Sequence, residues 1–247
     1  MGNTKSKKSN DNTFTRTLDL AEIDSYQVLH HVLRTIWDGN FMSPIMHLLK
    51  SDNGANVLDV SCGPGTWTCE MSSDFRNSTF TGIDVVPMFP DQKPSNVKFI
   101  LQQDLTSGLP FYDNSFDFIH LRLCWYYFTF DQWRTTVIKE FVRLLKPGGP
   151  ATLNFCEDIK ARAKDKQLDP EITYHLPTIL SSTPTLSSEV HYELRTIPCG
   201  SWGGKVGEHH EQAIKDLVTK CYNEYLSPKA ANKVVEQILN EFKEFRT

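Results

Sequence analysis

The chain has 247 residues, a length that suits one large α/β domain or, less readily, two small ones. With 39% hydrophobic and 11% aromatic residues it can bury a sizeable core, which excludes disorder for most of its length. Its formal charge of -4 at pH 7 gives no overall attraction to nucleic acid, so no nucleic-acid partner is expected. No charge-free apolar run approaches the ~20 residues of a membrane-spanning helix. The composition therefore indicates a soluble, globular protein.

The six cysteines of the chain indicate a reducing compartment and no metal site. They lie far apart, with no C-x-x-C pair and no histidine spacing typical of zinc binding. No apolar stretch follows the N-terminal lysines, so we expect no secretory signal. We therefore predict reduced thiols in a cytoplasmic protein.

The front of the chain divides into a tail and two helices. Residues 1–17 are polar and basic without an apolar period, which predicts a flexible tail before a single domain over residues 18–247. Apolar residues at helical spacing predict a helix over residues 20–37. The residues expected on its one apolar face are Leu20, Ile23, Tyr26, Leu29, Leu33, Ile36 and Trp37. A second short helix is predicted over residues 44–49.

From residue 56 onward, short apolar strands alternate with helices. Strands are predicted over residues 56–60, 78–84, 97–102, 116–123 and 151–155, with a helix from the first glycine turn to about residue 75 and another over 131–145. This alternation is typical of a doubly wound, mostly parallel sheet. The cofactor-binding core would then span about residues 55–156.

The pattern is weaker in the last third of the chain. Residues 177–188 are rich in Ser, Thr and Pro, which predicts a loop or lid. Two further strands are predicted over residues 190–198 and 204–208, followed by two helices, the second with Ser227 as its cap. The predicted fold class is therefore α/β, a seven-stranded doubly wound sheet with an N-terminal helical lid.

The most informative segment is residues 57–67 (VLDVSCGPGTW), a strand followed by a glycine turn and a helix. Gly63 and Gly65 remove side chains where a ligand would approach the backbone. Asp84 ends the next strand, where its carboxylate can accept hydrogen bonds from vicinal ribose hydroxyls. Asp104 follows the third strand, where it can accept from an adenine amine. Because the carboxyl ends of parallel strands share one edge, these residues together describe an adenosine site.

Two adenosine-containing cofactors fit this description, and one position separates them. A dinucleotide site needs a third glycine where this chain has Thr68, because pyrophosphate binds at the helix N-terminus. S-adenosylmethionine has no phosphate and carries a sulfonium charge, which the carboxylate of Asp59 favours. The sequence therefore favours S-adenosylmethionine, and a nicotinamide-dependent oxidoreductase is the disfavoured alternative.

The chain resembles class I S-adenosylmethionine-dependent methyltransferases, and within them the fungal LaeA-type regulators. Beside the glycine motif, the resembling blocks are residues 39–45 (GNFMSPI), 78–84 (STFTGID), 109–122 (LPFYDNSFDFIHLR), 142–149 (VRLLKPGG) and 201–208 (SWGGKVGE). Their order and spacing cover most of residues 20–155 and a patch near the C-terminus. The resemblance implies a Rossmann-like methyltransferase fold.

The resemblance also implies roles for individual residues. It assigns to cofactor binding the residues Asp59, Ser61, Gly63 and Gly65 around the methionine moiety, Asp84 and Val85 at the ribose, Gln103, Asp104 and Leu105 at the adenine, and Leu121 and Arg122 beneath the methionine end. Two positions depart from the family pattern. Ser61 stands where the family usually has the first glycine of the turn, and Ser25 stands where related proteins often place an arginine.

Methyl transfer is a direct displacement, so the enzyme mainly aligns the reactants and excludes water. A general base is needed only where the acceptor must lose a proton, and the candidates are His120, Tyr126 and Glu157. For His120 a purely structural role is the competing interpretation. The methyl acceptor would be a small molecule or a protein. The alternative function is a regulatory protein that binds the cofactor with little or no turnover, an interpretation that the Ser61 departure motivates.

The first residues of the chain carry a lipidation pattern. Residues 1–6 (MGNTKS) fit M-G-x-x-x-[ST], in which Gly2 receives a myristoyl chain. One acyl chain binds membranes only marginally, but Lys5, Lys7 and Lys8 would add roughly 1 kcal/mol each near an anionic leaflet. The pattern thus predicts peripheral membrane contact, and an ordinary solvated basic tail is the alternative.

Mass spectrometry of the protein purified from its native cells decides between these two interpretations of the tail. If the pattern is functional, the N-terminal peptide carries a myristoyl group on Gly2. An N-terminal peptide without this modification would remove the predicted membrane contact.

Overall fold

The computed structural model describes residues 20–41, 45–124, 127–154, 172–183, 193, 195, 197–223 and 227–245. The predicted tail with Gly2, and the candidate bases Tyr126 and Glu157, lie outside these ranges. The predictions for these residues therefore stay predictions.

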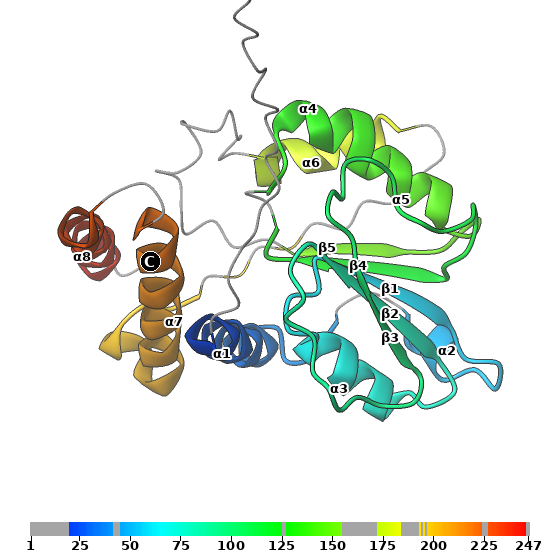
Figure 1. Ribbon diagram of the computed structural model, residues 1–247, viewed down its shortest axis with the longest axis horizontal. Helices are drawn as coiled ribbons and strands as arrows, with labels where there is room; N and C mark the ends of the chain where they lie inside the picture. The colour runs from blue at the N-terminus through cyan, green and yellow to red at the C-terminus, as the bar shows by residue number, and fades with distance from the viewer. Residues whose placement is uncertain are drawn as a thin grey trace, which may run out of the picture.

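A five-stranded sheet forms the centre of the molecule (Figure 1). Its strands are β1 (Asn56–Val60), β2 (Thr79–Asp84), β3 (Val97–Leu101), β4 (Phe118–Arg122) and β5 (Ala151–Asn154). They lie in the order β3-β2-β1-β4-β5, and every neighbouring pair is parallel. The chain thus begins at the middle strand, winds outward to β3, and returns to the other side of β1 for β4. This confirms the predicted doubly wound parallel sheet and places its topological switch between β1 and β4.

Helices cover both faces of this sheet (Figure 1). One face carries α2 (Met46–Leu49) and α3 (Thr66–Asp74), and the other carries α4 (Phe130–Gln132), α5 (Ile138–Leu144) and α6 (Ile172–Ser181). Side chains alternate between the faces along each strand. In β1, Val57 packs in the cluster that contains Trp67 of α3, whereas Leu58 packs in the cluster that contains Phe141 of α5. A buried parallel sheet therefore explains the nearly continuous apolar runs of its strands.

The helix predicted over residues 131–145 is present with one local irregularity. It begins with Thr129, whose hydroxyl and backbone form a capping box with Gln132. A π-helical stretch then covers Trp133–Val137 before α5 continues to Leu144. The indole of Trp133 is fully buried at this point, beneath the sheet.

Three helices form a second layer beside the sheet, on the left of Figure 1. They are α1 (Leu20–Ile36), α7 (Gly204–Asn223) and α8 (Pro228–Phe245). Leu29 and Leu33 of α1 pack with Ala213 of α7, as predicted for the apolar face of this helix. The prediction is wrong for Leu20, which is 74% exposed at the first residue of α1. The helix α1 thus lies between the C-terminal helices and the edge of the sheet where strands end.

The predicted strand over residues 204–208 is wrong, because these residues form the first turns of α7. The glycines of this segment allow close packing instead of extended pairing. A Cβ atom on Gly207 would lie 2.2 Å from the carbonyl oxygen of Gly200, whose N–H donates to Gly207. Residues 193, 195, 197 and 198 form no strand either, and the rest of the strand predicted over 190–198 lies outside the described ranges. The described sheet therefore has five strands, where seven were predicted.

The loop predicted over residues 177–188 is wrong for its first part. Residues 177–181 continue α6, even though Pro177 lies inside the helix. Burial overrides the local signal, since Leu176 and Ile179 of this helix belong to the core cluster on the α5 face. Residues 182 and 183 follow the helix, and residues 184–188 lie outside the described part of the chain.

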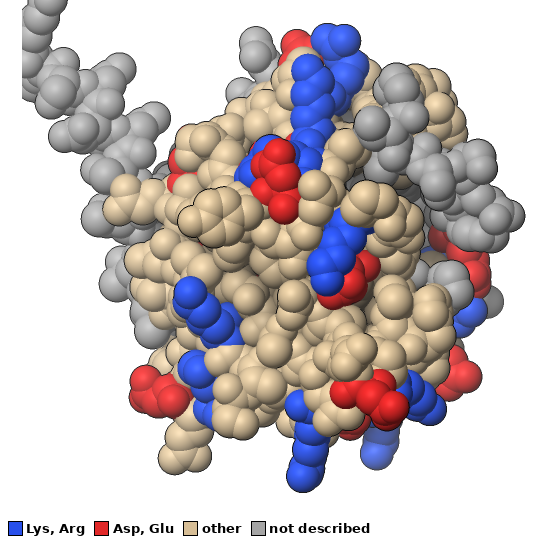
Figure 2. All heavy atoms as spheres, turned by 90° about the vertical axis from the view of Figure 1, so that its right-hand side faces the viewer, with Lys and Arg blue, Asp and Glu red and all other residues tan. Residues whose placement is uncertain are grey.

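The surface of the described residues shows no membrane-spanning character. None of their helices has both the length and the apolar sequence that crossing a bilayer requires. On the face shown in Figure 2, Lys and Arg side chains lie interspersed with Asp and Glu. Among the described residues, Lys146 forms an ion pair with Asp117 at 2.8 Å.

The turn from β1 into α3 depends on left-handed backbone conformations. Ser61, Gly63 and Gly65 have φ values of 56°, 54° and 73°. At Gly65 a side chain is also excluded sterically, because a Cβ atom would lie 2.4 Å from the ring of Phe99. Ser61 adopts the same region with a side chain, which disfavours it by about 1–2 kcal/mol relative to a right-handed conformation. The departure from glycine at this position therefore leaves a local strain in the loop.

We expect Ser61→Gly to stabilise the protein. Relief of the left-handed strain outweighs the extra freedom that glycine gives the unfolded chain, for a net gain of roughly 0.5–1 kcal/mol. Urea unfolding measures this gain. Ser73→Gly is the matched control, because Ser73 is an exposed residue in the last turn of α3 and this variant should lose roughly 0.5 kcal/mol. Equal losses in both variants would contradict the proposed strain.

Candidate functional site

A pocket opens where the carboxyl ends of β1, β2 and β4 face α1 and α3. Six residues singled out from the sequence line it together: Asp59, Ser61, Gly63, Asp84, His120 and Arg122. They come from three strands that are neighbours in the sheet, so the topology brings them to one edge. This is the edge at which open α/β sheets bind their ligands.

Asp84 ties the glycine loop to the end of β2. Its Oδ2 atom accepts a hydrogen bond of 2.8 Å from the N–H of Gly63, and its Oδ1 atom accepts one of 3.0 Å from the N–H of Val86. Gly63 leaves this part of the pocket open, because a Cβ atom placed on it would meet nothing within 4 Å. The carboxylate and an unobstructed stretch of backbone therefore lie side by side.

Asp59 is a buried carboxyl group at the floor of the pocket, with 3% of its surface exposed. Its Oδ2 atom accepts a hydrogen bond of 2.5 Å from the hydroxyl of Thr68. Burial raises the pKa of Asp59 to about 7, and the charge of Asp84 adds to this rise, while the Thr68 hydroxyl and Arg122 oppose it. Thr68, the position that argued against a dinucleotide, thus has a role of its own in holding Asp59.

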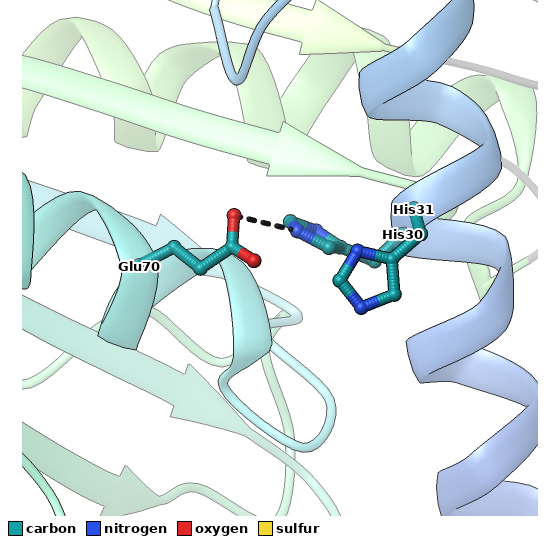
Figure 3. A group of neighbouring side chains, drawn as sticks. All are labelled: His30, His31 and Glu70. Carbon is teal, nitrogen blue, oxygen red and sulfur yellow. Dashed lines mark ion pairs between the residues drawn. The ribbon is translucent and has the colours of Figure 1, made fainter.

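Arg122, at the end of β4, belongs to a chain of polar contacts that reaches α1 and α3. Its Nη2 atom lies 2.6 Å from Nδ1 of His30, and Nε2 of His30 lies 3.0 Å from a carboxylate oxygen of Glu70 (Figure 3). The same oxygen of Glu70 accepts a hydrogen bond of 3.0 Å from the side-chain amide of Asn40 and lies 3.3 Å from the guanidinium of Arg34. Burial, followed by the charge of Arg122, lowers the pKa of His30 to about 4, so its imidazole is neutral near pH 7. Burial lowers the pKa of Arg122 to about 10, which leaves it charged.

Three residues of this region also place potential metal ligands close together. One ligand atom each of His30, His31 and Glu70 lies within 4.8 Å of the others (Figure 3). However, both ring nitrogens of His30 already contact Arg122 and Glu70. With two guanidinium groups around these ligands, the local charge favours an ion-pair network over a bound cation.

His120 forms part of the pocket wall beside Asp59. The two residues are paired in the register between β1 and β4 and share the face of α3. The imidazole is 2% exposed and stacks on the indole of Trp67, with ring centroids 3.8 Å apart and planes at 10°. Neither ring nitrogen has a hydrogen-bond partner within the described structure. Burial, then the charges of Arg122 and His30, lowers the pKa of His120 well below its usual value.

The remaining cofactor-binding candidates do not line the pocket. Gly65 is covered by the ring of Phe99, and Leu105 and Leu121 belong to the core cluster on the α5 face, against which Val85 packs. Gln103 and Asp104 are exposed after β3. The carboxylate of Asp104 accepts hydrogen bonds from the N–H of Thr106 at 2.7 Å and from its hydroxyl at 2.6 Å.

Ser25, the second departure from the family pattern, is turned toward the C-terminal helices. Its hydroxyl donates to the carbonyl oxygen of Ala21 at 2.9 Å and lies 3.5 Å from a carboxylate oxygen of Asp216 in α7. The side of α1 that meets the pocket instead presents Tyr26 and His30.

Several pocket residues were missed by the sequence reasoning. Tyr26 and His30 lie four residues apart on a helix, and this spacing places them on one face. Trp67 belongs to the glycine motif itself, and its indole N–H donates to the carbonyl oxygen of Asn40 at 2.7 Å. The helical spacing alone could have suggested that His30 and Tyr26 act together, but not that they meet the end of β4.

Comparison with known proteins agrees with this geometry. Residues 57–149 match the family described as "Methyltransferase domain". The "Secondary metabolism regulator LAE1" of Cochliobolus heterostrophus is 30% identical over 115 residues, which are 47% of this chain and 36% of that protein. The "Protein-methionine methyltransferase laeA" of Emericella nidulans is 30% identical over 66 residues, or 27% of this chain and 18% of that protein. The chain thus spans well under half the length of these relatives.

The fold of this chain is similar to that of solved structures. Phosphoethanolamine N-methyltransferase 2 of Haemonchus contortus, solved with phosphomonomethylethanolamine and S-adenosylhomocysteine, matches with a TM-score of 0.51 at 18% identity. The match covers 90% of this chain and 54% of that one. Residues 57–149 are therefore similar to methyltransferase domains, and the chain shares the α/β fold of this solved methyltransferase. Over part of its length the chain also resembles the fungal LaeA-type proteins.

Proposed function

We propose that this protein binds S-adenosylmethionine and transfers its methyl group to a small-molecule or protein acceptor. One observation carries the proposal: the ends of β1, β2 and β4 bring Asp59, Asp84 and Arg122 into one pocket with the glycine loop. The match of residues 57–149 to a methyltransferase domain supports the same reaction class.

The residues of the pocket fit this cofactor. Asp59 and Asp84 provide negative charge for a ligand that bears a sulfonium and an ammonium group. The open side of Gly63 admits a ligand against the backbone. The carboxylate of Asp84, held by two backbone N–H groups, is the group on this edge that would orient ribose hydroxyls.

The cofactor supplies a methyl group bound to a positively charged sulfur, which a nucleophile can displace. The protein's part is then to align the acceptor and to exclude water. The stacked rings of Trp67 and His120 form a flat, buried wall suited to this task. Because His120 is neutral near pH 7 and its ring nitrogens lack partners in the described structure, it can accept a hydrogen bond from a protonated acceptor.

A second function is favoured by Ser61 and by the names of the relatives. Several relatives are named secondary metabolism regulators, and the left-handed Ser61 strains the loop that would contact the cofactor. A regulatory protein that binds the cofactor with little turnover would need the pocket but not an aligned acceptor.

Thermal unfolding with S-adenosylmethionine, S-adenosylhomocysteine or NADH tests the cofactor. At one hundred times its dissociation constant a ligand adds ~2.7 kcal/mol, or roughly 5–10 °C for a domain of this size. We expect this shift with both adenosyl ligands and not with NADH. Asp84→Ala should lose the shift, whereas Asp131→Ala, at an exposed residue of α4, should keep it. No shift of the unsubstituted protein with either adenosyl ligand would overturn the proposal.

The same variants separate an enzyme from a regulator. A methyl-labelled cofactor is incubated with a cell extract, and label transferred to any acceptor is measured. Transfer that Asp84→Ala abolishes and Asp131→Ala retains supports the enzyme. A ligand-dependent melting shift without transfer would favour the regulatory function.

Cofactor affinity should rise with pH because of Asp59. A cationic ligand favours the ionised carboxylate, and with a pKa of about 7 Asp59 is mostly protonated at pH 6 and mostly ionised at pH 8. If binding requires the ionised form, affinity for S-adenosylmethionine increases roughly tenfold over this interval. His30, with a pKa of about 4, stays neutral throughout and adds nothing.

Calorimetric titration at both pH values measures this dependence, and Asp59→Asn is the control. The asparagine variant keeps a hydrogen-bond acceptor for Thr68 but cannot ionise. Its affinity for S-adenosylmethionine should therefore be weak, and the part of the pH dependence that is due to Asp59 should be absent. Any titration of the ligand itself is common to both proteins. The same pH dependence in both would exclude Asp59 as its source.

A further inference from the structure

Arg122 uses its guanidinium in an unusual way. Its strongest partner in proteins is a carboxylate bound by two parallel N–H groups. In the described structure its hydrogen-bond partner is instead the neutral imidazole of His30, at 2.6 Å. Asp59 and Glu70 lie near enough to affect the pKa of Arg122, yet neither carboxylate forms a two-pronged ion pair with its guanidinium. The guanidinium of Arg122, a charged group with five N–H donors, therefore lines the pocket while only its Nη2 atom contacts His30.

The contact with His30 fixes the direction of that guanidinium. Arg122 has no acceptor, so Nδ1 of His30 must accept its hydrogen bond, and the ring proton then lies on Nε2. Nε2 of His30 lies 3.0 Å from a carboxylate oxygen of Glu70, so its proton is placed next to a negative charge. The carboxylate of Glu70 also accepts a hydrogen bond from Asn40 and forms an ion pair with Arg34. These contacts connect α3 through α1 to β4 and place Nδ1 of His30 against the guanidinium of Arg122.

The pocket has an acidic and a basic side chain on neighbouring strands. Asp59 on β1 is opposite His120 on β4, and Arg122 follows two residues later on the same face of β4. An acid and a guanidinium therefore stand on neighbouring strands and line the same cavity. A ligand end that carries both an ammonium and a carboxylate matches this arrangement, whereas an end with the ammonium alone leaves the cation of Arg122 unmatched.

We propose that His30 and Glu70 are positioning residues, which hold Arg122 toward the pocket so that it binds the carboxylate of an α-amino-acid group. The helix α1 thereby affects which ligand binds, although the charged group that contacts the ligand belongs to β4. This inference rests on the proposed function, since the amino-acid group would be the methionine end of the cofactor.

The test compares two ligands that differ by one group. S-adenosylhomocysteine carries the carboxylate, and its decarboxylated analogue has the same adenosyl and amine groups without it. Calorimetric titration of the full chain should give at least a tenfold higher affinity for S-adenosylhomocysteine, because a charge-assisted hydrogen bond is lost with the analogue. Equal affinities would overturn the proposal and leave the proposed cofactor in place. Binding of neither ligand would instead contradict the proposed function itself.

Variants then identify the residues responsible. Arg122→Gln should lower the affinity for S-adenosylhomocysteine by about 10–100-fold and leave that of the analogue nearly unchanged. His30→Phe and Glu70→Gln should narrow the difference between the two ligands, with Arg122 itself intact. Arg122→Lys keeps the charge, loses the fork and should give an intermediate difference.

Arg134→Gln is the matched control, because it also removes an arginine that forms an ion pair, in this case with Asp131, and it contacts neither the pocket lining nor Glu70. It should keep the full difference between the ligands. If His30→Phe and Glu70→Gln weaken both ligands by the same factor, the two residues are only structural and the proposal is wrong. The ratio of affinities is decisive here, since loss of stability alone lowers binding of both ligands together.

Discussion

The hydrogen bond from the N–H of Gly63 to the carboxylate of Asp84 joins the two halves of the site. It links the loop after β1 to the end of β2, and so fixes the loop relative to the sheet. The left-handed residues that precede α3 are compatible with this bond only because the loop turns sharply at Ser61 and Gly63. The position of Thr68 over Asp59 follows from the helix that the loop begins. A single anchored turn thus determines where the buried acid lies and which backbone faces the cavity.

The pocket concentrates ionisable groups in a buried environment, which makes it costly for the fold. Burial raises the pKa of Asp59 and lowers those of His30 and His120, and each shift records a charged state that the folded protein disfavours. The ring nitrogens of His120, which have no hydrogen-bond partner among the described residues, add a further cost. Buried polar groups of this kind are retained where function needs them, since apolar side chains of similar size would serve stability better.

Much of the fold could be predicted from the sequence because its signals are local. Each strand of the sheet is a short apolar run bounded by turn residues, and the parallel order follows from the alternation with helices. The same local reasoning failed at residues 204–208, where glycines that permit close packing on Gly200 look like strand or turn residues. It also failed at α6, where Leu176 and Ile179 are buried by a distant part of the chain.

The site divides in the same way. Asp59, Gly63 and Asp84 belong to strand ends whose meeting the topology dictates, so spacing alone located them. Arg122, His30 and Glu70 come from β4, α1 and α3, and their contacts depend on how α1 packs against the sheet. No spacing along the chain contains that information. Asp104 shows the opposite case, since a residue at a strand end can serve its own turn instead of the cavity.

The helix α1 belongs to two packing systems at once. Its one side carries Leu29 and Leu33 against α7, and Ser25 near Asp216, while its other side carries His30 toward β4. Because a helix is rigid over this length, a rotation accepted on one side must appear on the other. Sequence changes in α7 are therefore constrained by the ligand-facing residues of α1. In divergent descendants of this chain, substitutions at positions 25 and 216 should therefore accumulate together. Exchanging only the C-terminal helices between two such descendants would shift α1, and with it the side of the pocket that Tyr26 and His30 line.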